Sequence, residues 1–131
     1  MQKLSKTLRE SFGQDVIAQI ATRDMSAFDG RISIYDGARR TDDLSALTGL
    51  PNFFLIYVEA DIEVRYARVV ARAENGGDSE KSYAGFLEEE LGEAESRTKS
   101  LKALAHFVVD NSGNESEFTA RIEEIVKGVL E

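Results

Sequence analysis

The chain has 131 residues, 42% hydrophobic and 31% charged, which predicts one domain over residues 1–131 with a core of its own. Its formal net charge of −8 disfavours nucleic acid and anionic membrane surfaces as partners, because long-range electrostatics repel both. Cysteine is absent, which excludes disulfides and thiolate chemistry, and the single histidine, His106, leaves little room for a histidine metal site. No apolar run has the length of a membrane span and the first residues lack a signal-peptide pattern, so a cytoplasmic location is expected.

The first part of the chain predicts helices around one strand. Residues 4–22 carry apolar side chains at helical spacing, and Gly13 is expected to divide them into two helices. Residues 31–35, Arg-Ile-Ser-Ile-Tyr, predict a β-strand. A short helix is expected over 42–48, before the turn at Gly49-Leu-Pro.

The remainder alternates strands with helices. The continuous apolar run at 53–58 is typical of a strand covered on both faces, as in a parallel sheet. Asp61 is a candidate cap for a helix that runs to about Ala73. The later expected elements are helices over 82–91 and 93–104, a strand over 107–109 and a helix over 115–129. This order predicts an α/β fold in which helices flank a parallel sheet.

A first candidate site follows the strand predicted at 31–35. An acid at the end of a strand, a glycine and two cations stand together as Asp36-Gly-Ala-Arg39-Arg40. Asp36 could hold magnesium through water or receive a proton from an attacking oxygen, or it could simply form the turn before Gly37. Arg39 and Arg40 could bind phosphate or be surface residues, and they cannot both easily face one site.

A second candidate is a row of arginines on the helix after the second predicted strand. At about 100° per residue, Arg65, Arg68 and Arg72 share one narrow sector beside the apolar face. Such a ridge could clamp a polyphosphate. The alternative is a solvated face on which the arginines pair with Glu63 and Glu74.

Two further places have both a functional and a structural interpretation. Arg9, on the first helix, could reach a substrate phosphate or be an ordinary surface arginine. The Asn111-Ser-Gly113 turn follows the last predicted strand, at the sheet edge where α/β proteins bind ligands, and could equally be a plain turn.

Taken in order, these motifs resemble the C-terminal two-thirds of P-loop nucleotide kinases, over about residues 4–130. The resemblance is strongest to the dephospho-CoA kinase-like and nucleotide kinase branch of the adenylate kinase superfamily. The motifs are the strand with Asp-Gly-x-Arg, the Arg-x-x-Arg-x-x-x-Arg helix, a lid-like segment at about 74–100 with Phe86 and Glu90, and the final Asp110-Asn-Ser-Gly turn.

The resemblance implies phosphoryl transfer from ATP, with magnesium, to a nucleotide-like acceptor. Asp36, Arg68 and Arg72 would be catalytic, Arg65, Asn111 and Gly113 would bind ATP, and Arg9 and Arg39 would bind the acceptor. No protein residue is expected as a dedicated metal ligand.

One departure from these kinases is large. The sequence contains no Gly-x-x-x-x-Gly-Lys-Ser/Thr loop, whose backbone amides cradle the phosphates, and no strand to precede it. That strand lies in the middle of the kinase sheet, so its absence would leave strand edges unpaired and favour association into a homo-oligomer. We therefore expect a fragment of a kinase that is inactive by itself, or alternatively a non-catalytic interaction module on the same scaffold.

Overall fold

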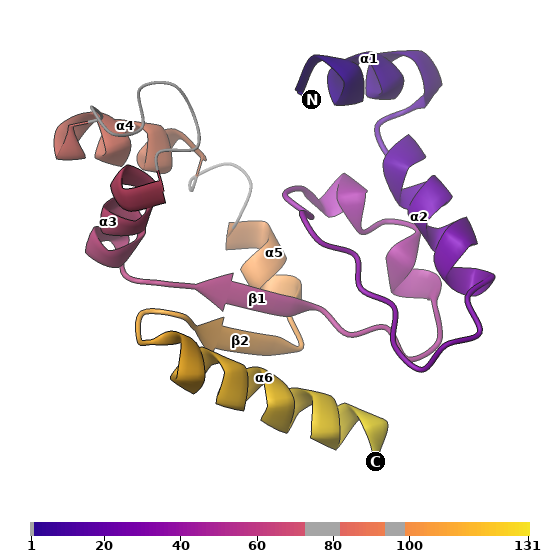
Figure 1. The fold of residues 1–131 in the computed structure, drawn as a ribbon. Helices are drawn as coiled ribbons and strands as arrows, with labels where there is room; N and C mark the ends of the chain where they lie inside the picture. Colours follow the sequence, from indigo (N-terminus) through magenta and orange to yellow (C-terminus); the bar gives the residue numbers. More distant parts are fainter. Residues whose placement is uncertain (1, 73–81, 94–98) are drawn as a thin grey trace. The chain divides into compact units, whose positions relative to one another are not determined.

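The computed structural model describes residues 2–72, 82–93 and 99–131 (Figure 1). Its contacts cluster into two compact units, Met1–Phe53 and Phe54–Glu131. The described elements are α1 (Gln2–Phe12), α2 (Val16–Ser26), η1 (Thr41–Asp43), η2 (Leu47–Gly49), β1 (Ile56–Glu59), α3 (Ile62–Arg72), α4 (Tyr83–Glu93), α5 (Lys99–Leu104), β2 (Phe107–Asp110) and α6 (Glu115–Leu130). That the chain forms one domain stays a prediction.

The first unit begins with the two predicted helices. Gly13 separates α1 from α2 and has a φ of +107°, a left-handed conformation that glycine adopts without the penalty of a side chain. Its N–H donates to the Arg9 carbonyl at 3.1 Å and so closes α1. The division of residues 4–22 into two helices is therefore confirmed. The apolar side chains buried in this unit are Ala18, Leu44 and Leu47.

The strand predicted at 31–35 is wrong. This segment has no strand assignment, and the side chains of Ile32 and Ile34 are 46% and 84% exposed. Its β-branched residues favour extended backbone, but a strand exists only when a neighbouring segment accepts and donates its backbone hydrogen bonds. No described segment pairs with 31–35 in this way.

The prediction of one short helix over 42–48 is also wrong. Two 3₁₀ turns, η1 and η2, take its place. Local polar contacts compete with α-helical bonding here, since the Ser45 hydroxyl donates to the Asp42 carbonyl at 3.0 Å and the Thr48 hydroxyl to the Ser45 carbonyl at 3.2 Å.

The second unit is built on a pair of parallel strands. β1 and β2 pair with Ile56 opposite Phe107 and Glu59 opposite Asp110. This confirms the predicted α/β fold with a parallel sheet flanked by helices, and within the described residues the sheet has these two strands. β1 begins three residues later than the apolar run at 53–58 indicates, because only Ile56 onwards joins the ladder.

Helices follow both strands, as predicted. α3 starts directly after Asp61, whose carbonyl accepts the N–H of Arg65 at 3.0 Å, and α6 starts after Asn114. α6 contacts β2 and runs beside it in Figure 1. The second unit buries Phe86, Leu101 and Val109. The 75–79 loop and parts of the lid-like segment at 74–100 lie outside the described residues.

Of the helices that the structure describes, none combines the length and apolar character needed to cross a membrane.

Candidate functional site

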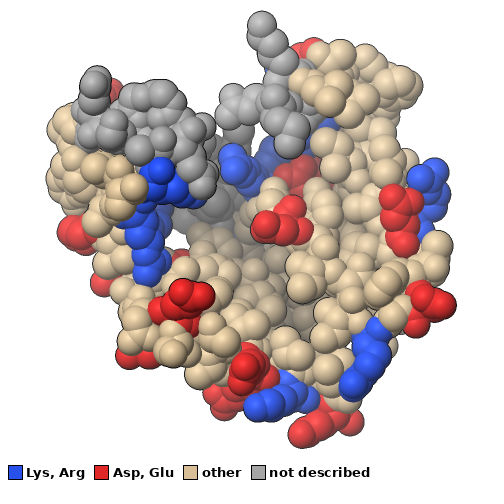
Figure 2. Space-filling view, in the orientation of Figure 1, with Lys and Arg blue, Asp and Glu red and all other residues tan. Residues whose placement is uncertain are grey.

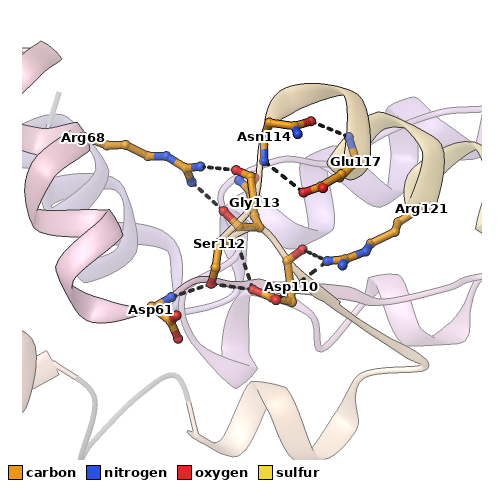
Figure 3. A network of polar contacts seen from close by, with 9 residues as sticks. Asp61, Arg68, Asp110, Ser112, Gly113, Asn114, Glu117 and Arg121 are labelled. Carbon is orange, nitrogen blue, oxygen red and sulfur yellow. Dashed lines mark hydrogen bonds and ion pairs between the residues drawn. The ribbon is translucent and has the colours of Figure 1, made fainter.

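The carboxyl ends of β1 and β2 are tied together by one hydroxyl group. Ser112 Oγ accepts the N–H of Asp61 at 2.8 Å and donates to Asp110 Oδ1 at 2.6 Å (Figure 3). The Ser112 N–H also donates to Asp110 Oδ1, at 2.8 Å. The turn after β2 is therefore fastened to the start of α3, at the sheet edge where α/β proteins bind ligands.

Arg68 reaches this turn from α3. Its Nη1 donates to the Asn111 carbonyl at 2.7 Å and its Nη2 to the Gly113 carbonyl at 3.0 Å (Figure 3). One residue that the kinase resemblance assigned to catalysis, Arg68, thus lies against two that it assigned to ATP, Asn111 and Gly113. Arg68 contacts the backbone of the other two, so it shapes the turn as well as carrying charge to it.

The turn continues into the N-terminus of α6. Asn114 and Glu117 form a capping box in which each side chain accepts the other's backbone N–H, at 3.0 and 3.1 Å. A Cβ at Gly113 would lie 1.9 Å from Glu117 Oε2, so a larger residue there would displace the carboxylate from its cap. This close approach accounts for glycine at position 113.

Asp110 is held as a carboxylate at the end of β2. Hydrogen bonds from the Ser112 side chain and backbone lower the pKa of Asp110, and the Arg121 guanidinium adds to this effect. Arg121 lies 3.8 Å from Asp110 Oδ2 and donates to the Asp110 carbonyl (Figure 3). Asp110 therefore stays charged throughout the physiological pH range.

The other two arginines of the ridge differ in their surroundings. Arg65 donates through Nε to the Ala60 carbonyl at 3.1 Å and forms an ion pair with Glu90 of α4. Arg72 lies exposed in the last turn of α3. The predicted pairing with Glu74 lies outside the described residues.

In the first unit, Arg40 is a structural residue. It lies 2.8 Å from Asp43 and donates to the side chain and the carbonyl of Gln14, at 3.0 and 3.1 Å. Its side chain is 21% exposed. Arg39 uses its backbone N–H on Asp43 at 3.0 Å, and residue 39 is exposed. The side chains of Arg39 and Arg40 therefore differ in exposure, and a role for Arg39 at a ligand site stays a prediction.

The predicted acceptor residues Arg9 and Arg39 and the predicted catalytic residue Asp36 all belong to the first unit. Asp36 is exposed and precedes Gly37, which has a φ of +93°. Arg9 is half-buried and lies within electrostatic reach of Tyr35. Burial and the Asp43 charge raise the pKa of Tyr35, and Arg9 and Arg40 oppose that rise.

Charge is dispersed over the surface. In Figure 2 lysine and arginine side chains lie among aspartates and glutamates on the face shown. With a net charge of −8, anion binding therefore depends on local groups such as the ridge of Arg65, Arg68 and Arg72. Among the described residues there is no group of three or more histidines, aspartates or glutamates placed to hold a metal ion.

Sequence reasoning missed the contributions of Ser112, Asp61, Arg121 and Glu90. The Asp110-x-Ser112 spacing was a usable signal, because an Asp side chain often accepts the N–H two residues later. The contacts of Ser112 with Asp61 and of Arg65 with Glu90 join residues 51 and 25 positions apart, and no local pattern marks them.

The chain is an α/β protein in which the turn after β2 and the start of α3 meet at the carboxyl ends of two parallel strands. No family model matches the chain. It is similar to UPF0200 proteins of archaea: one from Saccharolobus islandicus and one from Saccharolobus solfataricus are each 23% identical over 99% of this chain and 69% of their own length. One from Thermococcus kodakarensis is 23% identical over 98% of this chain and 71% of its own length. These names state no activity.

Proposed function

We propose that this chain supplies part of an ATP-dependent kinase that acts on a nucleotide or dephospho-CoA-like acceptor. The second unit carries the residues for ATP, and the first unit carries the residues for the acceptor. The observation that carries the proposal is the grip of Arg68 on the Asn111 and Gly113 carbonyls, at 2.7 and 3.0 Å. It brings a cation to the carboxyl edge of a parallel sheet, where phosphate ligands of α/β proteins bind.

The residues present fit Mg-ATP as a ligand in chemical type. Arg68 and Arg72 would neutralise charge on the phosphates, and the turn at 111–113 would lie beside the base. Magnesium usually keeps several waters and takes one or two carboxylates together with the phosphates. Bound Mg-ATP would supply the phosphoryl group for transfer.

Calorimetric titration of the purified chain with Mg-ATP tests this proposal. We expect measurable binding that Arg72→Ala weakens by about three- to tenfold, in line with the loss of one charged hydrogen bond to a phosphate. Arg23→Ala is the matched control, because Arg23 is a 77% exposed arginine of α2 paired with the adjacent Asp24. The absence of binding, or equal weakening by both variants, would refute the assignment of the ridge to ATP.

Catalysis by the isolated chain is expected to be very weak. The sequence has no glycine-rich loop ending in Lys-Ser/Thr to position the phosphates, and positioning supplies most of the catalysis in phosphoryl transfer. Ordinary kinase turnover with a nucleoside monophosphate or dephospho-CoA, followed by phosphorus NMR, would contradict this part of the proposal.

The alternative is a non-catalytic interaction module that associates through its sheet. It is favoured by exposed apolar side chains on both faces of the strand pair, since Val58 on one face and Val108 on the other are each 47% exposed. Size-exclusion chromatography with light scattering tests association. A stable homo-oligomer that does not bind Mg-ATP would support this alternative, and a monomer that binds Mg-ATP would refute it.

A further inference from the structure

Arg65 joins the end of β1 to helix α4. Its Nε donates to the carbonyl of Ala60, the residue after β1, at 3.1 Å. Its Nη1 donates to Glu90 Oε2 of α4. The guanidinium is thus anchored on one side by the backbone and bound on the other by a carboxylate.

A hydrogen bond and two ring pairs also connect α3 with α4, and the Tyr83 hydroxyl of α4 donates to Glu63 Oε1 of α3 at 3.4 Å. Tyr66 of α3 lies 5.1 Å from the ring of Tyr83, with the planes at 68°, and 5.6 Å from the ring of Phe86, at 51°. Phe86 is only 5% exposed. The buried ring of Phe86, these ring pairs and the charge contact between Arg65 and Glu90 together hold α4 against α3.

The charges of the two helices are complementary. α3 contains three arginines and one glutamate, whereas α4 contains four glutamates and no basic residue. α4 therefore presents an anionic helix to a cationic one.

We propose that Glu90 occupies Arg65 in place of an anionic ligand, so that a polyphosphate binding to Arg65 displaces Glu90 and releases α4 from α3. The side chains of Arg65 and Glu90 are 41% and 24% exposed, which lets a dissolved anion reach the pair. The Ala60 contact keeps Arg65 in place while its partner is exchanged. The inference rests on the proposed function for the identity of the ligand, the phosphate chain of a nucleotide.

Inorganic tripolyphosphate is the probe for the exchange itself. Glu90→Gln keeps the size of the side chain and removes the competing charge, so it should tighten tripolyphosphate binding by about two- to fivefold, the range expected for one partly exposed ion pair. Glu88→Gln is the matched control, since it makes the same charge change at an exposed position of the same helix. Equal affinities in the two variants, or no tripolyphosphate binding in any of the three proteins, would overturn the inference.

A measurement on the unchanged protein keeps the test independent of the variants. Nuclear Overhauser contacts between the rings of Tyr66 and Phe86 should weaken as tripolyphosphate is added, and their persistence at saturation would overturn the release of α4. Mg-ATP then separates this inference from the kinase proposal. If ATP binds no more tightly than tripolyphosphate while the rings still separate, the nucleotide function fails and the exchange at Arg65 stands.

Discussion

Ser112 and Asp61 connect the two strand ends through a single hydrogen bond of 2.8 Å, from the Asp61 N–H to the Ser112 hydroxyl. Because the same hydroxyl donates to Asp110, its orientation is set by the residue that ends β2. The start of α3 and the turn that Arg68 grips are thereby placed relative to one another.

Replacing Ser112 should therefore loosen the edge of the sheet. Ser112→Ala removes the acceptor for Asp61 and a donor to Asp110, and we expect it to lower the free energy of unfolding by about 1–2 kcal/mol. Urea denaturation followed by circular dichroism measures this. Ser116→Ala, at an exposed position in the first turn of α6, is the control and should change stability by less than about 0.5 kcal/mol. Equal effects would show that the hydroxyl bridge contributes no stability.

Replacing Arg68 with lysine should disturb the turn at 111–113, even though lysine keeps the positive charge. Arg68→Lys cannot place two fixed donors on the Asn111 and Gly113 carbonyls. We expect amide resonances of residues 111–113 to shift and unfolding free energy to fall by about 1 kcal/mol. Arg72→Lys, on the same helix, should leave those amide resonances in place. Unchanged 111–113 resonances in Arg68→Lys would contradict the grip seen in the structure.

Asp43 should make the protein sensitive to acid. Burial alone would raise the pKa of Asp43, but hydrogen bonds from the Arg40 side chain and from the Arg39 and Arg40 backbone outweigh it and hold the pKa below its usual 3.8. The carboxylate therefore contributes stability that is fully present above about pH 5 and is lost as the pH falls through the lowered folded-state pKa.

Asp43→Asn tests this prediction. It should destabilise the protein at neutral pH by about 2–3 kcal/mol, because Arg40 would keep its charge in a half-buried place without its anionic partner. The difference from the unchanged protein should shrink between pH 5 and pH 2 in urea titrations. Asp42→Asn, at an exposed neighbouring position, serves as control. A difference that is constant with pH would refute the role of the Asp43 charge.

Replacing each of two glycines with alanine should change the free energy of unfolding in opposite directions. Gly13 has a φ of +107° and a Cβ there would meet Asp15 Oδ1 at 3.3 Å, so Gly13→Ala should destabilise by about 1–2 kcal/mol. Gly128 lies in α6 with open space around its Cβ position, so Gly128→Ala should stabilise by about 0.5–1 kcal/mol. Thermal unfolding of the two variants checks both signs, and stabilisation by Gly13→Ala would contradict the helix break.

The local sequence pattern predicted most of the helices and strands in the second unit. The spacing of apolar residues predicted α3 and α6, with Asp61 as the expected start of α3, because a helix is made by bonds between residues four apart. The apolar run before Asp61 and the short run before Asn111 predicted two parallel strands. Parallel strands end at one edge, so the approach of Arg68 to the 111–113 turn could be expected in outline.

At residues 31–35 the local sequence pattern led to a wrong prediction. The composition of this segment is that of a strand, yet the described structure offers it no pairing partner. Likewise, nothing in the sequence near Arg39 and Arg40 tells which arginine is used on Asp43 and Gln14 and which is exposed.

The sequence by itself thus determined α1, α2, α3 and α6, the break at Gly13 and the α/β class, because these follow from contacts between residues close in the chain. Only the tertiary structure decided that 31–35 pairs with no strand among the described residues, that Arg65 binds Glu90 and that Ser112 joins Asp61 to Asp110. Each of those outcomes depends on which distant group comes within about 3 Å, and a hydrogen bond exists only at that range.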